Sequence, residues 1–462
     1  MLNLFMHYLF GNTFAKILGL ISLPIYTYFI SPQEYGLFSI IMSYIAVSTF
    51  LFTMNVHTSV SRFLYEENVN VNSFISATII LTCISFIMVF SALSLIDDSW
   101  LNSFLGFNFS LYETYFYLLI FFSAFSLIYM QILVPSSKGK EHSALSVLQA
   151  YMRFGIIMIF FYFIESTALR MLQGIVIADA IISIYIFWKL KNYFTFIFNM
   201  SNVKYILNYS VLLIPYTISG VVLAQIDRVM IGSILGETEA GIYSVAYIIG
   251  SVPLMIYASL SNAWMPKYFT CMNEKKFDLL DRDTVSIVFI FSGVVIIFST
   301  FMGYIFTLVL ANNYHNALQY IPLITISMFF AIMWNIWGRG IGYAKKTLWS
   351  SVVGTISAVA NIYLNSIFIP SYGIDGAVYA TYLSYMLMAY LGYLLAKYLL
   401  NIHTTSMRKI KIPWIFIFIY TVGYLVFKNN FILLMSLLLP FGVLALYYIN
   451  MKEVHQFFNK SR

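Results

Sequence analysis

Residues 284–310 read TVSIVFIFSGVVIIFSTFMGYIFTLVL, an apolar run without one charged side chain. A helix of this length measures about 40 Å and easily crosses a hydrocarbon core about 30 Å thick. Similar runs recur from the first residues to about position 450. Of the 462 residues, 61% are hydrophobic and 9% are charged, whereas about 25% are charged in soluble proteins. The sequence therefore predicts an all-α polytopic membrane protein and excludes a water-soluble fold.

The hydropathy pattern predicts fourteen transmembrane helices. Their approximate ranges are 4–30, 37–61, 73–96, 114–135, 143–164, 170–189, 205–234, 241–264, 284–310, 318–338, 348–369, 376–397, 412–427 and 431–450. The connections between them are short and leave no room for a soluble domain. We therefore expect the functional groups inside the helix bundle or at its rims.

Lysine and arginine gather in alternate connections between these helices. One set of connections, with the C-terminal tail, holds twenty of the 25 cations, and the other set holds only Arg170 and Lys428. Cytoplasmic loops of membrane proteins are enriched in Lys and Arg, so this asymmetry predicts that both termini are cytoplasmic. The net charge of +7 does not indicate nucleic-acid binding, because no basic stripe with interleaved aromatics is present.

A displacement of 205 residues superposes parts of the chain on one another. It places Glu34-Tyr35-Gly36-Leu37-Phe38-Ser39 on Glu239-Ala240-Gly241-Ile242-Tyr243-Ser244, Arg62-Phe63 on Lys267-Tyr268, and Lys140 on Lys345. A constant offset of this kind indicates an internal repeat, here of six helices. Because six is even, the two repeats are parallel, with a cavity expected between them. We expect an N-terminal lobe at 1–199, a C-terminal lobe at 200–402, and two further helices and a cytoplasmic tail at 403–462.

Four further motifs lie near the ends of predicted helices. They are Leu23-Pro24 followed by Ser31-Pro32-Gln33-Glu34-Tyr35-Gly36, Asp227-Arg228-Val229-Met230-Ile231-Gly232, Ala263-Trp264-Met265-Pro266, and Ile369-Pro370-Ser371-Tyr372-Gly373-Ile374-Asp375-Gly376-Ala377. With these motifs the chain resembles, over nearly its whole length, the O-antigen or polysaccharide repeat-unit flippases of the multidrug/oligosaccharidyl-lipid/polysaccharide exporter superfamily.

This resemblance implies a multi-pass protein of the bacterial plasma (inner) membrane. Such a protein carries an undecaprenyl-diphosphate-linked oligosaccharide from the cytoplasmic to the outer leaflet, for O-antigen, lipopolysaccharide or other surface polysaccharide biosynthesis. By analogy, its partners are the lipid-linked oligosaccharide, membrane lipids, the glycosyltransferases that deliver the cargo and the polymerase that receives it. Transport of this kind is not an enzymatic reaction.

Charged side chains inside predicted helices are the main candidates for function, because each costs about 2.5–3.5 kcal/mol at mid-bilayer unless a partner or ligand compensates it. Lys16, Arg153 and Arg228 are the candidate cations for binding a diphosphate in the cavity. Lys16 could instead pair with Asp179. Arg153 and Asp179 lie at similar depths in adjacent helices, so they form either a structural ion pair or a diphosphate clamp with a titrating coupling carboxylate.

Asp227 and Arg228 are neighbours, about 100° apart around a helix, so we expect them to have different partners. Asp227 is a second coupling or ion-pair candidate, and Arg228 either contacts the cavity or clasps the two halves. The repeat-related cations Arg62 and Lys267 either guide an anionic head group inward or anchor the cytoplasmic helix ends. Trp334 and Trp337 are expected to be packing or interfacial residues. The alternative is that they line a vestibule for the sugar beside Arg339.

Cysteine and histidine show no pattern of a metal or redox site. Cys83 and Cys271 lie in or beside apolar segments, and the six histidines have no ligand spacing. We therefore expect no metal, no cofactor and no catalytic residue.

Three other functions are compatible with a helical membrane protein of this size. A cation-coupled multidrug or metabolite exporter of the same superfamily would use Asp179, but Lys16 and the two extra helices favour an anionic lipid-linked cargo. A lipid II flippase also has fourteen helices, with more basic residues in its first helix. A membrane glycan polymerase would need a large outer loop with basic catalytic residues, and the connection from about Ile96 to Glu113 contains no Arg, Lys or His.

Overall fold

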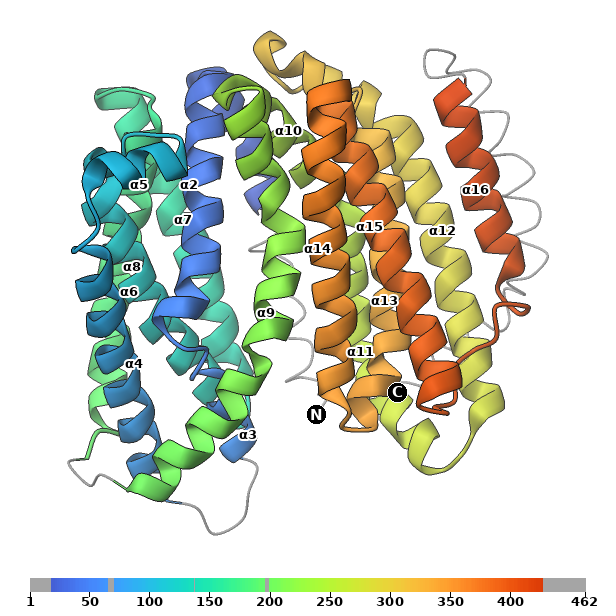
Figure 1. The fold of residues 1–462 in the computed structure, drawn as a ribbon, viewed down its shortest axis with the longest axis horizontal. Coiled ribbons are helices and arrows are strands. Elements are labelled where there is room, and N and C mark those ends of the chain that lie inside the picture. Colours follow the sequence, from blue (N-terminus) through green and yellow to red (C-terminus); the bar gives the residue numbers. More distant parts are fainter. Residues whose placement is uncertain (1–17, 65–69, 137, 196–198, 427–462) are drawn as a thin grey trace. The chain divides into compact units, whose positions relative to one another are not determined.

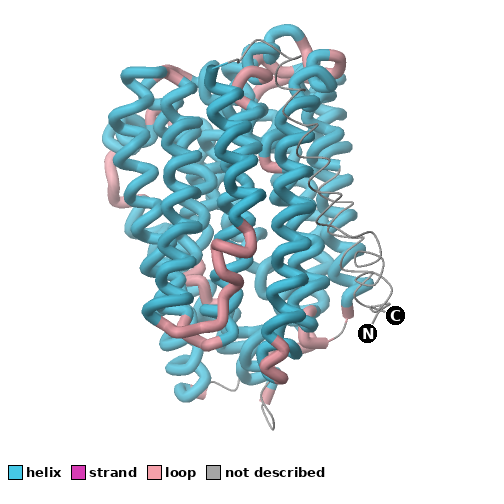
Figure 2. The backbone as a smooth tube through the Cα atoms, turned by 90° about the vertical axis from the view of Figure 1, so that its right-hand side faces the viewer, coloured by secondary structure: helices cyan, strands magenta, loops and turns pink. Residues whose placement is uncertain are grey.

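The computed structural model describes residues 18–64, 70–136, 138–195 and 199–426. Within these ranges the chain is helical with short connections and contains no strand (Figure 2). Eleven described helices are long and apolar enough to cross a membrane, and Leu18–Phe29 and Lys411–Val426 are shorter apolar helices. The predicted span at 431–450 and the first part of that at 4–30 lie outside the described residues. The all-helical membrane architecture is confirmed, and the count of fourteen stays a prediction.

Contacts among the helices divide the chain into two compact units, Met1–Ser244 and Val245–Arg462. Unit 1 holds α2 (Pro32–Phe52), α3 (Thr58–Phe63), α4 (Val71–Leu93), α5 (Asp98–Leu105), α6 (Phe109–Leu133), α7 (Gly139–Phe163), α8 (Ala168–Lys191), α9 (Met200–Ile234) and the first half of α10 (Glu237–Gly250) (Figure 1). Unit 2 holds the rest of α10 and α11 (Val252–Asn273), α12 (Phe277–Thr307), η1 (Asn312–Ala317), α13 (Ile321–Tyr343), α14 (Thr347–Tyr372), α15 (Ile374–Leu394), η2 (Leu395–Leu399) and α16 (Lys411–Val426). The division into repeat lobes at 1–199 and 200–402, followed by the segment 403–462, stays a prediction.

Two local features depart from the predicted spans. The span expected at 37–61 is broken between α2 and α3, where Met54 and Asn55 adopt positive φ angles of 46° and 56°. The outer connection expected near residues 96–113 contains the short helix α5. Its N-cap Asp97 accepts hydrogen bonds from the backbone and hydroxyl of Ser99, which lower the pKa of Asp97. Turn and cap chemistry therefore decides these boundaries, where hydropathy carries little information.

The core of unit 1 joins α3, α4 and α9 through aromatic packing. Phe63 and Phe74 stack with ring centroids 3.6 Å apart, and the edge of Tyr205 meets both rings. Phe63 follows the repeat cation Arg62 in the sequence. The short helix α3, which is too short to be stable alone, is thus held in place by its apolar face.

The residues that match at an offset of 205 lie against one another in unit 1. The Ser244 hydroxyl donates a hydrogen bond to Ser39 Oγ at 2.8 Å. A Cβ on Gly36 would lie 1.7 Å from the carbonyl oxygen of Glu237, and one on Gly241 would lie 2.0 Å from that of Pro32. The offset places Pro32 on Glu237 and Gly36 on Gly241. It therefore exchanges the Gly36–Glu237 and Gly241–Pro32 contacts, so the N-terminal turns of α2 and α10 meet in a reciprocal contact. Such reciprocity is the signature of a two-fold relation.

The motif around Gly36 also fixes α8. Ser31 caps α2 by accepting a hydrogen bond from the Glu34 backbone N–H, and Pro32 occupies the first turn. The Glu34 carboxylate accepts a hydrogen bond from the backbone N–H of Ala168, the first residue of α8, at 2.7 Å. An acidic group at a helix N-terminus is favourable because it meets unpaired N–H groups. The motif therefore positions α8, which carries Asp179.

Helix α13 is the most buried span of unit 2. In its most apolar stretch, 83% of residues are buried. Trp337 is 1% exposed and packs on Tyr393 and Trp414, with ring centroids 5.0 and 6.1 Å away. A helix that is apolar around its whole circumference belongs at the centre of a bundle. The other helices of unit 2 pack around this centre.

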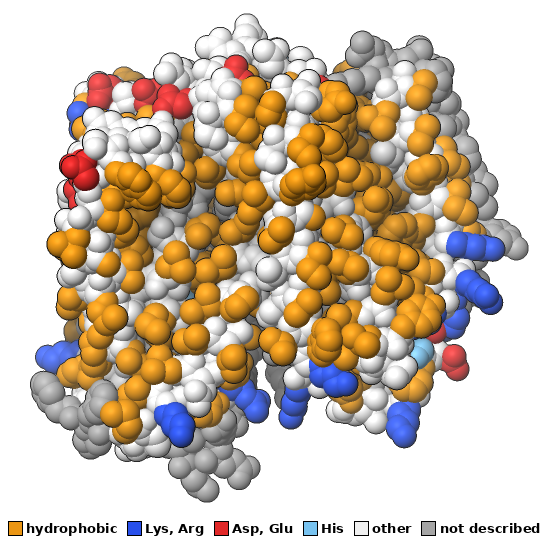
Figure 3. All heavy atoms as spheres, in the orientation of Figure 1, with side chains coloured by type: hydrophobic (Ala, Val, Ile, Leu, Met, Phe, Trp, Pro, Cys, Tyr) orange, Lys and Arg blue, Asp and Glu red, His pale blue; other side chains and the backbone are white. Residues whose placement is uncertain are grey.

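The surface of unit 1 has the polarity of a membrane protein. Figure 3 shows apolar side chains along the flank of its helices, Asp and Glu gathered at one end, and Lys and Arg gathered at the opposite end. An apolar belt between polar ends matches a bilayer and its two aqueous faces. The assignment of the basic end to the cytoplasm stays a prediction.

Candidate functional site

Arg153 and Asp179 form an ion pair within the membrane-spanning part of unit 1. Arg153 lies on α7 and Asp179 on α8. The Arg153 Nε and Nη2 atoms donate to the two Asp179 carboxylate oxygens at 2.8 and 2.6 Å, and Gln149 Nε2 donates to Oδ1 at 3.0 Å. The Asp179 side chain is 2% exposed and that of Arg153 is 34% exposed. Three donors therefore satisfy a buried carboxylate, which would be very costly to bury alone.

The geometry of this pair leaves part of the guanidinium open. A guanidinium has five N–H donors, and Asp179 takes one from Nε and one from Nη2. Among the described residues, no acceptor is found for the N–H groups of Nη1. The open edge suits a phosphate oxygen, because guanidinium binds phosphate in bidentate fashion. Asp179 holds the Arg153 guanidinium in position. The Asp179 carboxylate itself is buried, and its oxygens already accept hydrogen bonds from Arg153 and Gln149.

Asp227 and Arg228 are both buried on α9, with 1% and 7% exposure. Asp227 Oδ2 accepts a hydrogen bond from the Tyr243 hydroxyl at 2.5 Å. Arg228 Nη1 donates to the Ala224 carbonyl oxygen at 3.0 Å and to the Gln225 side chain. Tyr243 lies on α10, two residues after Gly241, whereas Ala224 and Gln225 lie on α9 itself. Whether Arg228 contacts the cavity or clasps the two halves stays a prediction.

The repeat-related cations Arg62 and Lys267 have different environments. Lys267 Nζ lies 2.6 Å from Asp283 Oδ2, and the Lys267 side chain is 47% exposed. The Trp264 indole N–H also donates to Asp283, at 3.4 Å. Arg62 lies exposed on α3, and no described carboxylate pairs with it. Lys267 is thus paired with a carboxylate, and the roles of both cations stay predictions.

Arg339 is a cation whose environment was not predicted. Its guanidinium carbon lies 4.7 Å from the Trp264 ring centroid and 5.6 Å from that of Tyr268. Nη2 donates to the Ser261 hydroxyl, while Nη1 is buried without a hydrogen-bond partner in the described part of the chain. The signal lay in the Trp264 motif, but only the packing of α11 on α13 brings the two side chains together.

Three further predictions concern Lys16, the two tryptophans of α13 and the absence of a metal site. Lys16 lies outside the described residues. The burial of Trp337 speaks against its lining a sugar vestibule, and Trp334 is likewise only 8% exposed. Within the described ranges, no group of three or more His, Cys, Asp or Glu is arranged to hold a metal ion.

Several solved transporters share this fold. An inward-facing multidrug resistance MATE family transporter of the MOP superfamily has a TM-score of 0.67 and 15% identity, covering 84% of this chain and 94% of its own. The lipid II flippase MurJ, in an inward closed conformation, has a TM-score of 0.64 and 17% identity, covering 98% and 99%. A MATE structure in complex with MaD3S has a TM-score of 0.63 and 14% identity, covering 87% and 95%. At these identities the likeness shows the fold.

Comparison of sequences gives the family. None of the curated proteins compared with this chain matches it. A family model described as polysaccharide biosynthesis protein matches residues 3–272, more than half of the chain. The chain therefore belongs to the polysaccharide biosynthesis protein family, and it shares its fold with the solved transporters above.

Proposed function

We propose that this protein is a flippase that moves an undecaprenyl-diphosphate-linked oligosaccharide repeat unit from the cytoplasmic to the outer leaflet of the bacterial plasma membrane. The product serves O-antigen or another surface polysaccharide. The protein binds and releases its cargo unchanged and is not an enzyme. Fourteen helices, with both termini in the cytoplasm, complete the proposed topology.

The observation that carries this proposal is the Arg153 guanidinium, which lies inside a membrane-spanning segment of a polysaccharide biosynthesis protein. Asp179 fixes its position, while its Nη1 side has no described acceptor. A lipid-linked sugar carries a diphosphate, and this head group needs cations to replace water while it crosses the bilayer. The likeness to MurJ supports a lipid-linked cargo, because its fold extends over nearly the whole chain.

The proposed mechanism is alternating access between the repeats at 1–199 and 200–402. Lys16, Arg153 and Arg228 bind the diphosphate, and Arg62 and Lys267 draw the head group toward the inward opening. Polar and aromatic side chains pass the glycan, while the polyprenyl tail stays in lipid. Asp179 and Asp227 position cations or couple transport to an ion. Glycosyltransferases and a polymerase are the proposed pathway partners.

The experiment is deletion of the gene in its host, with extraction of polyprenyl-linked oligosaccharides and an assay of the leaflet that holds them. We expect repeat units to accumulate in the cytoplasmic leaflet and surface polysaccharide to fall. Complementation with Arg153→Ala should fail at normal protein level, and Arg153→Lys should restore part of the export. Unchanged glycolipids and polysaccharide, in a host with no second flippase, would overturn the proposal.

A matched control is available on α8. Arg170 also pairs with a carboxylate, since its Nε lies 3.2 Å from Glu165 Oε1, but the Glu165 side chain is 51% exposed and the pair lies at the helix end. Arg170→Gln removes the same positive charge as Arg153→Ala. We expect Arg170→Gln to support normal export, so a failure specific to Arg153 cannot come from charge loss alone.

The fold likeness to MATE transporters also supports a second candidate, a cation-coupled exporter of small molecules. In such a protein Asp179 would bind the coupling cation. Its two oxygens already accept three hydrogen bonds from Arg153 and Gln149, which speaks for the flippase. Drug sensitivity of the deletion strain, with unchanged glycolipids, would favour the exporter.

A further inference from the structure

The segment between η2 and α16 is anchored on one buried carboxylate of α12. Asp281 accepts hydrogen bonds from the Thr405 hydroxyl at 2.7 Å and from Lys409 Nζ at 2.7 Å, and His403 Nε2 lies 3.1 Å from its Oδ1. The Asp281 side chain is 9% exposed. The hydrogen bond to Asp281 raises the pKa of Lys409, so the pair stays charged. This anchor holds the 403–409 segment against the end of α12.

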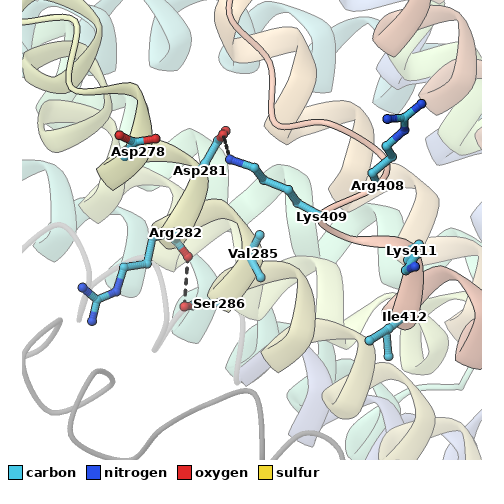
Figure 4. Close-up of a pocket in the computed structure, with 9 residues that line it drawn as sticks. All are labelled: Asp278, Asp281, Arg282, Val285, Ser286, Arg408, Lys409, Lys411 and Ile412. Atoms are coloured by element: carbon cyan, nitrogen blue, oxygen red, sulfur yellow. Dashed lines mark hydrogen bonds and ion pairs between the residues drawn. The ribbon is translucent and has the colours of Figure 1, made fainter.

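A pocket of about 420 Å³ lies beside this anchor, between α12 and the start of α16 (Figure 4). The volume is within the range of small-ligand sites. Figure 4 shows Lys409 reaching across to Asp281, with Arg282 and Arg408 extending away on opposite sides of this pair. The titratable lining residues are Asp278, Asp281, Arg282, Arg408, Lys409 and Lys411, with a net charge of +2.

Two of the four cations that line the pocket, Arg408 and Lys411, have no carboxylate partner among the described residues. Lys409 is neutralised by Asp281. Arg408 and Lys411 are exposed. The pocket therefore offers positive charge to a ligand from outside the unit.

The pocket also lies where polar sequence gives way to apolar sequence. Its charged residues precede the apolar runs that begin near residues 284 and 412, and its other lining residues include Val285 and Ile412, at the start of those runs. This is the depth at which a lipid presents its phosphate to the charged rim and its first acyl carbons to the apolar floor. A free phosphate would leave Val285 and Ile412 without a partner.

We infer that this pocket binds the phosphate head group of an anionic membrane lipid, such as phosphatidylglycerol. Arg408 and Lys411 contact the phosphate, and Val285 and Ile412 contact the glycerol end of the chains. Basic pockets between transmembrane helices are known sites for anionic lipids. The site is separate from the Arg153–Asp179 pair and does not depend on the proposed transport activity.

The test uses the purified full-length protein in detergent, with native mass spectrometry to measure binding of phosphatidylglycerol against phosphatidylcholine of the same chains. Arg408→Gln/Lys411→Gln should weaken phosphatidylglycerol binding by about 10- to 30-fold, since two charge contacts are lost. Lys345→Gln/Lys346→Gln removes the same charge from the exposed α13–α14 turn and should change binding by less than about twofold. Asp278→Asn removes a competing negative charge and should strengthen binding by a few fold.

Three results would overturn the inference. Equal weakening by the two double variants would show only general attraction to charge. Weaker binding by a folded Asp278→Asn protein would contradict the electrostatics of the rim, because loss of a repulsive charge should strengthen the binding of an anion. Displacement of the lipid by millimolar inorganic phosphate would assign the pocket to free phosphate.

Discussion

Separating Arg153 from Asp179 should destabilise unit 1 in an asymmetric way. Arg153→Ala leaves the Asp179 carboxylate at 2% exposure with Gln149 as its remaining donor. Asp179→Ala leaves a guanidinium that is already 34% exposed and whose long side chain can extend toward the membrane interface. We therefore expect Arg153→Ala to cost more stability than Asp179→Ala.

Two limits set the expected loss of unfolding free energy in these variants. Removing one partner of a fully buried pair costs about 3–5 kcal/mol in soluble proteins. Hydrogen bonds between transmembrane helices average only about 0.6 kcal/mol, with a maximum of about 1.7 kcal/mol. Because Arg153 is partly exposed, we expect about 2–3 kcal/mol for Arg153→Ala and about 1–2 kcal/mol for Asp179→Ala. The double variant should recover part of this loss, with a coupling free energy of about 1.5 kcal/mol.

The assay is a double-mutant cycle on the purified protein, with unfolding followed by denaturant titration in mild detergent. Arg170→Gln serves as the control, because its partner Glu165 is 51% exposed and the pair should contribute less than about 1 kcal/mol. A coupling free energy below about 0.5 kcal/mol would refute the reasoning, since independent effects would mean that the two side chains do not stabilise each other. A larger loss for Asp179→Ala than for Arg153→Ala would refute the asymmetry.

Two further predictions concern helix contacts. Gly36→Ala and Gly241→Ala each force a Cβ to within 2.0 Å of a backbone carbonyl oxygen, so both should sharply lower the yield of folded protein in size-exclusion chromatography. The control variants Gly155→Ala and Gly220→Ala have open space around the new Cβ and should be neutral or slightly stabilising. Equal yields for all four variants would contradict the close approach of α2 and α10. Arg339→Lys keeps the positive charge but loses the contact of the guanidinium with the Trp264 ring, so it should lower the free energy of unfolding by about 1 kcal/mol. An Arg339→Lys protein as stable as the wild type would show that this contact contributes nothing to stability.

The repeat is the part of the fold that the sequence predicts most directly. The offset of 205 comes from a few short matches, and two of its pairs, Ser39–Ser244 and Gly36–Gly241, lie in contact. Hydropathy also locates the long spans, because an apolar run of 20 residues in lipid has few alternatives to a helix. It misses the break at Thr53–His57 and the helix α5, since both depend on local caps and turns.

The candidate site is predictable only in part. Depth along neighbouring helices was enough to suggest that Arg153 meets Asp179. It did not show that Asp283 would pair with Lys267, or that Arg339 would stack on Trp264, because these contacts join helices whose rotation is set by packing. Sequence spacing gives the height of a residue in the membrane, while its partners depend on the faces that neighbouring helices present.

The most direct test of the central claim is transport by the purified protein alone. Proteoliposomes would contain a polyprenyl-diphosphate-linked oligosaccharide, and a membrane-impermeant sugar-modifying reagent would report the fraction exposed outside over time. The account predicts that the wild-type protein exposes the protected half of the lipid much faster than empty liposomes do, that Arg153→Ala slows this exposure, and that Arg170→Gln does not. Exposure at the rate of empty liposomes, with folded wild-type protein present and any required ion gradient imposed, would contradict the account.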